Sequence, residues 1–202
     1  MWYFVYCYPE IIVVLIECER DRTILKNKNM SMTQAAFLKR LDMPSKFKIE
    51  ESINKLGYEF KILDEFVDLY NQEGLSCEIN GYKTYFEIYF DEPSEIINDF
   101  EWIEKDLTNE DIVISFVWGA DFAGGACIGL VSVALIDNCN ALIYYLDDEM
   151  KYSRQMLLDD MPQFLNELEK ENNRSRQNSL SSSSEFKQTK KSFLDKVKGF
   201  FK

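Results

Sequence analysis

Histidine, the side chain that most often moves protons near neutral pH, is absent from all 202 residues of the chain. This absence excludes Ser-His-Asp triads, Cys-His pairs and every metal site that uses histidine. The five cysteines lie in apolar stretches without Cys-x-x-Cys spacing, so we interpret them as reduced, core-packed thiols. Two-carboxylate and Ser-Lys chemistry remain open, but no spaced catalytic set is present. We therefore expect a protein that is not an enzyme and holds neither a metal nor a cofactor.

The carboxylates are better suited to binding a partner than to catalysis. The run Asp147-Asp148-Glu149 lacks the alternating oxygens and glycine of a calcium loop, which favours a solvated acidic turn. Trp102 is either an exposed anchor for a partner or a half-buried core residue. Glu92 could bind a partner or simply complement the dipole at a helix start. The candidate partner-binding residues are Asp91, Glu92, Glu101, Trp102, Asp121, Asp147, Asp148 and Glu149.

The acidic residues are concentrated in the middle of the chain. Residues 33–172 carry 29 Asp and Glu against 11 Lys and Arg, a net charge of −18. Residues 173–202 carry 2 acids against 8 bases, a net charge of +6. A domain this acidic repels a phosphate backbone, so we expect no nucleic-acid binding and predict a basic protein as the partner.

Hydrophobic periodicity predicts three helices in the first part of this acidic region. We expect them over residues 33–41, 46–56 and 64–73. Ser45 is the predicted cap of the second helix, Phe47 belongs to its apolar face, and Gly57 ends it. Gly74 is the predicted C-terminal cap of the third helix.

Alternating apolar residues then predict a hairpin, because Asn80-Gly81 supplies the positive φ angles of a type I′ turn between residues 75–79 and 82–90. On its second strand, Phe86 and Ile88 share one face, and Tyr85 and Tyr89 share the other. A helix over residues 95–106 and a strand over 111–118 follow.

The last part of the region is predicted to contain two strands and a helix. The strands cover residues 127–136 and 141–146, and the stretch 119–125 before them reads as a glycine-containing turn. Ser153 caps the final helix, which Pro162 could kink or divide.

The two ends of the chain differ from this core. Residues 1–18 are almost wholly apolar around Pro9-Glu10, which is compatible with a membrane anchor or two short strands. We favour a third interpretation, in which residues 1–29 are an extension upstream of a native start at Met30 or Met32. At the other end, residues 172–189 form a Ser-rich flexible linker.

Residues 190–202 are predicted to form a short basic amphipathic helix. Such a helix needs something to bind because about three turns are marginal alone in water. It could contact an anionic membrane, dock onto its own acidic core or act as a recognition helix. Its apolar docking residues are Phe193, Val197, Phe200 and Phe201.

Four stretches resemble the SUKH superfamily, which includes bacterial immunity proteins and a yeast cell-wall regulator. Residues 49–74 resemble its opening, with a helix ending in Leu-Gly and a second helix running into a glycine turn. Residues 85–96 resemble a strand that leads to an acidic helix start. Gly124-Gly125 resembles a glycine pair before a strand, and residues 141–168 resemble the closing strand, acidic turn and final helix.

The resemblance implies an α+β domain over residues 33–171, with a curved, mostly antiparallel sheet flanked by helices. It further implies a cytoplasmic immunity protein that binds and neutralises a bacterial toxin, such as a basic nuclease. The alternative is a membrane-associated regulatory scaffold without a toxin partner, anchored through residues 1–18 or the C-terminal helix.

Overall fold

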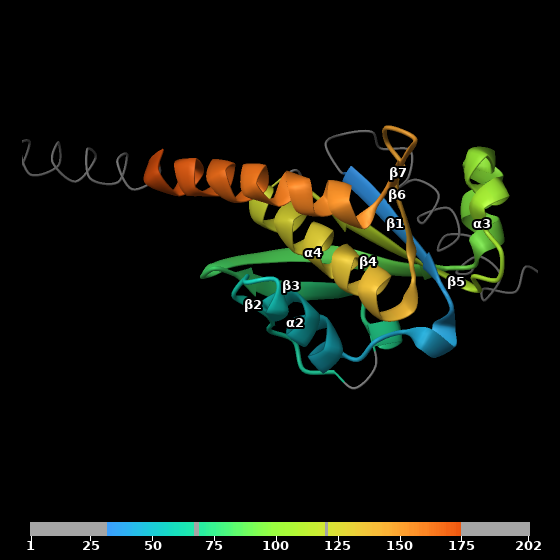
Figure 1. Ribbon diagram of the computed structural model, residues 1–202, viewed down its shortest axis with the longest axis horizontal. Helices are drawn as coiled ribbons and strands as arrows, with labels where there is room; N and C mark the ends of the chain where they lie inside the picture. The colour runs from blue at the N-terminus through green and yellow to red at the C-terminus, as the bar shows by residue number, and fades with distance from the viewer. Residues whose placement is uncertain (1–31, 67–68, 120, 175–202) are drawn as a thin grey trace, which may run out of the picture. The chain divides into compact units, whose positions relative to one another are not determined.

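The computed structural model describes residues 32–66, 69–119 and 121–174 (Figure 1). The expectations for residues 1–29, the Ser-rich linker beyond residue 174 and the C-terminal amphipathic helix lie outside these residues. The described part is built on a seven-stranded antiparallel sheet of order β2-β3-β4-β5-β1-β6-β7. The strands are β1 Met32–Leu38, β2 Phe60–Ile62, β3 Gly74–Ile79, β4 Tyr82–Asp91, β5 Ile112–Trp118, β6 Leu142–Tyr145 and β7 Met150–Tyr152.

Helices cover the two faces of the sheet unequally. The described helices are α2 Lys46–Lys55, α3 Pro93–Asp99, α4 Phe122–Cys139 and one over residues 154–174, with short 3-10 turns η1 Arg40–Asp42, η2 Leu69–Asn71 and η3 Glu101–Asp106. Figure 1 shows α4 lying across the sheet, with the helix of residues 154–174 beside it and α3 apart from both. The α2–α4 side buries the larger core, whereas α3 and η3 close a smaller cluster on the opposite face. The predicted α+β class, an antiparallel sheet with flanking helices, is confirmed.

The predicted helix over residues 33–41 is wrong, because this segment forms β1 at the centre of the sheet. β1 pairs with β5 on one side and β6 on the other, and residues 34–38 are all buried. Ala, Gln and Leu favour a helix in isolation, but hydrogen bonds to two neighbouring strands and burial of both faces override that preference.

The helix predicted over residues 46–56 is confirmed as α2, which ends before Gly57 at φ +93°. Ile49 and Ile53 are buried, but Phe47 is 69% exposed, so its predicted place on the apolar face is wrong. Phe47 precedes Ile49 by two residues, so the two side chains point about 200° apart around the helix axis, and Phe47 faces away from the core. Ser45 occupies the N-cap position without a side-chain hydrogen bond.

The helix predicted over residues 64–73 is also wrong, since the described residues there form only a bend and η2. Asp64 accepts a hydrogen bond from the backbone N–H of Ser76 at 2.5 Å, which ties the segment to β3. Gly74 is the first residue of β3 rather than a helix cap. The following hairpin is confirmed, with Asn80 and Gly81 at φ 48° and 83°.

The largest correction concerns residues 119–139. The predicted strand over 127–136 is instead part of α4, whose 18 residues include the Gly124-Gly125 pair. Nearly every side of α4 is buried, so its sequence carries no helical periodicity and reads like a buried strand. The helix begins at its N-cap Asp121 and ends at Asn140, which has left-handed geometry.

The remaining elements follow the sequence more closely. The predicted helix over residues 95–106 is divided at Phe100 into α3 and η3, and β5 and β6 lie where strands were expected. Ser153 accepts a hydrogen bond from Met156 N–H at 3.2 Å and so caps the last helix. That helix is not divided at Pro162 and continues through residue 174, three residues into the predicted linker.

Candidate partner-binding surface

The segment between β4 and β5 concentrates negative charge more strongly than the rest of the core. Residues 91–111, here called the acidic ridge, carry nine Asp and Glu and one base, Lys105, a net charge of −8. They comprise the end of β4, α3, η3 and the turn into β5. The exposed acids of the ridge are Glu92, Glu95, Asp99, Glu101, Glu104 and Asp111.

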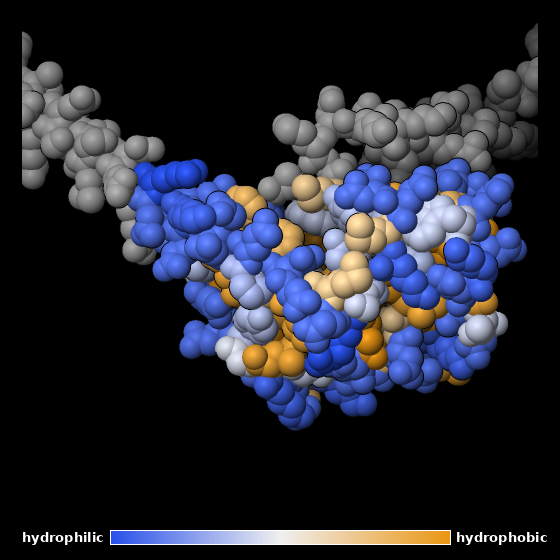
Figure 2. Space-filling view, turned by 45° about the horizontal axis from the view of Figure 1, so that its top comes forward, coloured by the Kyte–Doolittle hydropathy of each residue, from blue (hydrophilic) through white to orange (hydrophobic). Residues whose placement is uncertain are grey.

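The apolar side chains of the ridge explain why its acids face solvent. Ile103 is fully buried in the smaller core cluster, and it packs with residues of β1, β5 and β6. Ile96, Phe100, Trp102 and Leu107 are partly buried against the same cluster. With these residues directed at the sheet, the interleaved carboxylates are left on the outer side. Figure 2 shows hydrophilic side chains over most of the visible face of the described residues, with apolar ones between them.

A polar network fixes the base of the ridge to the sheet. The buried Tyr144 on β6 donates to Asp106 at 3.0 Å, and Lys151 on β7 donates to the same carboxylate at 3.1 Å. The bonds from Lys151 and Tyr144 lower the pKa of Asp106, whereas burial, together with the bond to Asp106, raises the pKa of Tyr144 well above its usual range. Asp106 therefore remains charged and holds η3 in place.

Trp102 is a half-buried core residue rather than a fully exposed anchor. Its ring packs edge-on against Tyr144, with 5.3 Å between ring centroids. Its indole Nε1 is buried and has no hydrogen-bond acceptor among the described residues. Its main contact is therefore with the sheet beneath the ridge.

Beside the ridge, the same face of the sheet carries two exposed tyrosines. Tyr85 and Tyr89 on β4 are 55% and 37% exposed. Tyr89 lies opposite Ser115 on β5, and β5 pairs with β1. On this face of the sheet, Ala35 and Phe37 of β1 belong to the cluster that the ridge covers. The two tyrosines, here called the tyrosine floor, therefore lie on the strand next to β5 and on the same face as that cluster.

The floor is held in place by its neighbours. The Tyr85 ring lies over Gly74 of β3, where an added Cβ would overlap the phenol. Tyr89 donates its hydroxyl hydrogen to Glu87 at 2.5 Å. Rigid aromatic side chains of this kind provide large contact area at small entropic cost. The alternation of residues 82–90 predicts that both tyrosines lie on one face of this strand, but neither is among the candidate partner-binding residues. Two aromatic side chains on the same strand face as charged ones are the sequence feature that could have identified them.

At the start of the ridge, Arg40 engages part of the negative charge. Its guanidinium lies 4.6 Å from the Tyr70 ring centroid and 3.6 Å from a carboxylate oxygen of Glu92. These residues border a hollow of about 140 Å³, whose lining also includes Asp91 and Glu95. Asp91 itself accepts a hydrogen bond from Ser115 at 3.1 Å. Glu92 is therefore partly neutralised, which makes it a weaker partner contact than the outer acids.

The structure brings only half of the predicted partner-binding residues together. Asp91, Glu92, Glu101 and Trp102 belong to the ridge, where β5 begins. Of the other four, Asp121 follows the far end of β5, about 20 Å along this seven-residue strand. Asp147, Asp148 and Glu149 lie in the turn between β6 and β7.

Two of these distant acids have structural roles. Asp121 accepts hydrogen bonds from Gly124 N–H at 2.6 Å and from the Thr84 hydroxyl at 3.1 Å, so it caps α4. Asp147 accepts one from Thr33 N–H at 2.8 Å. Asp148 and Glu149 are exposed in the turn before β7.

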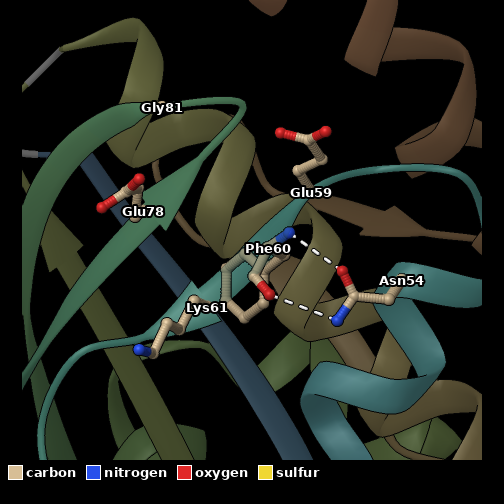
Figure 3. A pocket seen from close by; sticks show the side chains of 6 residues that line it. All are labelled: Asn54, Glu59, Phe60, Lys61, Glu78 and Gly81. Carbon is tan, nitrogen blue, oxygen red and sulfur yellow. Dashed lines mark hydrogen bonds between the residues drawn. The ribbon is translucent and has the colours of Figure 1, made fainter.

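A second hollow, of about 230 Å³, lies at the β2 edge of the sheet. Figure 3 shows Asn54 of α2 directed at Phe60, whose N–H and C=O it bonds at 3.0 and 3.2 Å. Glu50 similarly accepts from Ile62 N–H at 2.8 Å. Side chains of α2 thus occupy the edge groups of β2 that an added strand would need.

The thiols and the apolar helix α4 belong to the core. Cys77, Cys127 and Cys139 are buried and form no disulfide within the described residues. α4 is long and apolar enough to cross a bilayer by length and composition, but 78% of it is buried inside the protein, as in an ordinary core helix. In the described ranges, no group of three Cys, Asp or Glu is placed to hold a metal ion.

Comparison with known proteins found no relative of this chain. No protein-family model matches the chain, and neither a curated protein nor a solved structure matches it.

Proposed function

We propose that this protein is a binding protein that captures a basic protein partner on the acidic ridge and the tyrosine floor. The observation that carries the proposal is the ridge itself, a compact segment with nine acids, six of them exposed, and one base, beside two exposed tyrosines. Clustered carboxylates attract a basic partner from a distance and raise its rate of association. The tyrosines supply the rigid contact area that acidic side chains lack.

We further propose that the captured partner is a bacterial toxin, which makes this chain an immunity protein. The support for this step is the resemblance of residues 85–96 and 141–168 to the SUKH superfamily, together with the acidity of the core. Enzymes that cut nucleic acids carry cationic substrate grooves, and an acidic ridge can occupy such a groove. The membrane-scaffold alternative depends on residues 1–18 and 190–202, which lie outside the described residues.

A pair of charge-matched variants tests the location of the site. One variant reverses four ridge acids, Glu95→Lys, Asp99→Lys, Glu101→Lys and Glu104→Lys. The control reverses four exposed acids elsewhere, Glu59→Lys, Asp148→Lys, Glu169→Lys and Glu171→Lys. Each set changes the net charge from −12 by +8 to −4, so nonspecific effects of charge are equal.

The partner is first isolated from the native host by affinity purification, and its binding is then measured by calorimetry at several NaCl concentrations. We expect the ridge variant to bind at least about tenfold more weakly, a loss of ~1.4 kcal/mol, and the control to bind almost normally. If the partner is a toxin, co-expression of the ridge variant should also fail to protect cells. Equal weakening by both sets would show that the ridge is not the binding site.

A further inference from the structure

The described chain ends close to the first residue of β4. Asn172, near the end of the helix of residues 154–174, donates a hydrogen bond to the hydroxyl of Tyr82 at 3.3 Å. Tyr82 is the first residue of β4 and follows the Asn80-Gly81 turn. Figure 1 shows this end of the helix on the same side as the β3–β4 hairpin. Residues beyond Arg174 therefore start beside the first residue of β4, on the face of β4 that carries Phe86 and Ile88. Tyr85 and Tyr89 lie on the opposite face, so the following chain reaches them by passing around the adjacent Asn80-Gly81 turn.

The distance from this point to the floor and the ridge is short compared with the available chain. Tyr85 and Tyr89 are three and seven residues beyond Tyr82 along β4, which corresponds to about 10 and 23 Å. The ridge begins at the end of the same strand. Residues 175–189 number fifteen, and fifteen extended residues span up to about 50 Å. Residues 190–202 can therefore reach both surfaces without any change in the described fold.

The chemistry of residues 190–202 complements these two surfaces. The segment has five lysines and one aspartate, a net charge of +4, opposite the −8 of the ridge. Its apolar residues include Phe193, Phe200 and Phe201, which match the exposed rings of Tyr85 and Tyr89. A tether of this length also raises the effective concentration of the segment to the order of millimolar.

We infer that residues 190–202 bind in cis across the tyrosine floor and the acidic ridge. The lysines pair with the outer ridge acids, and the phenylalanines pack on Tyr85 and Tyr89. The segment is then an internal competitor that a basic partner must displace. The contact is intramolecular and requires no partner, so this inference goes beyond the proposed function and does not depend on it.

Zero-length cross-linking of the full-length protein tests the contact. A carbodiimide joins lysines to carboxylates that touch them, and peptide mass spectrometry of the monomer identifies the joined residues. We expect amides from the tail lysines, such as Lys191 and Lys196, to Glu95, Asp99 and Glu101. The exposed acids Asp148 and Glu59, away from the ridge, serve as internal references and should give few such links.

A full-length variant with Phe193→Ser, Phe200→Ser and Phe201→Ser is the matched control, because it retains every tail lysine. We expect the yield of cross-links to the ridge to fall at least about tenfold in this variant, which corresponds to a contribution of ~1.4 kcal/mol from the phenylalanines to docking of the tail. Undiminished links in this variant, or links spread evenly over all exposed acids, would overturn the inference. So would an absence of ridge links combined with sedimentation of the full chain on phosphatidylserine vesicles, which would assign the tail to a membrane. None of these measurements uses the separate partner, so a negative result here would leave the proposed function standing.

Discussion

Individual acidic residues in this protein differ sharply in what they do. Asp121 and Asp147 accept hydrogen bonds from backbone N–H groups, and Asp106 joins Tyr144 to Lys151. Glu101 and Glu104 project outward from η3. The first group stabilises the fold, since removing a carboxylate leaves its donors unsatisfied. Only the second group is free of such structural roles and suited to contact a partner.

Asp106 provides a test at this scale. Because bonds from Lys151 and Tyr144 lower its pKa below the usual 3.8, its ionised form stabilises the folded state. That stabilisation is fully present above the unfolded-state pKa and is lost as the pH falls through the folded-state value. Asp106→Asn should therefore unfold at lower urea concentration than the wild type at pH 7, and the difference should shrink below pH ~4. The exposed Asp99→Asn is the control, and a difference that persists at pH 2 would contradict this role.

Asn54 allows a second test of a single side chain. It bonds both the N–H and the C=O of Phe60, so Asn54→Ala should lower the free energy of unfolding by about 1–2 kcal/mol. Lys48→Ala, an exposed change on the same helix, should stay within about 0.5 kcal/mol of the wild type. Urea denaturation followed by circular dichroism measures both. Equal effects of the two changes would mean that Asn54 does not protect the β2 edge.

Among the elements, α4 determines how the helical layer is assembled. Its glycines allow the helix of residues 154–174 to approach closely, and a Cβ on Gly125 would lie 2.6 Å from the Phe164 ring. A Cβ on Gly129 would instead lie 2.5 Å from the terminal methyl of Met161. A phenyl ring is rigid, whereas the end of a methionine side chain can move. The two positions therefore have different tolerance for alanine.

We expect Gly125→Ala to destabilise the protein by about 1–3 kcal/mol, because overpacking displaces Phe164. Gly129→Ala should remain within about 1 kcal/mol of the wild type, since the higher helix propensity of alanine offsets the shift of Met161. Thermal or urea unfolding of the two variants gives the comparison directly. A larger loss at Gly129 would show that the packing between these helices differs from that described.

At the scale of the whole molecule, the excess of acids has consequences for stability as well as for binding. The core carries a net charge of −18, and like charges within a compact domain repel one another. Among the described residues, six acids lie within 4.0 Å of a basic nitrogen, as Asp137 does with Arg154 and Glu92 with Arg40. The remaining repulsion opposes the compact folded state.

Salt should therefore stabilise this protein. Raising NaCl from 0.02 to 0.3 M shortens the Debye length to about 6 Å and screens the repulsion between the acids. Each kcal/mol that the free energy of unfolding gains in this way should raise Tm by about 2–4 °C. Differential scanning calorimetry measures the shift. Both four-residue reversal variants should show a smaller rise, because their net charge is −4. A Tm that falls with NaCl would indicate that attractive ion pairs dominate instead.

The sequence by itself determined the elements whose signals are local. The Asn80-Gly81 turn, the alternation along β4, the Gly57 stop and the Ser153 cap each depend on a few neighbouring residues, and each was predicted correctly. The acidity of residues 91–111 can be counted from the sequence, and four of the candidate residues lie within this range. The α+β class, which the resemblance to the SUKH superfamily implies, is confirmed as well.

Only the tertiary structure decided the elements that are buried on every side. β1 and α4 are surrounded by other elements, so neither shows the period that separates a strand from a helix, and both were predicted wrongly. The tertiary structure also decided which acids lie close together in space. Asp121 and Asp147 are separated from the ridge by the order of the strands rather than by sequence distance. The tyrosine floor could be identified only from the exposure of Tyr85 and Tyr89 beside the cluster that α3 and η3 close.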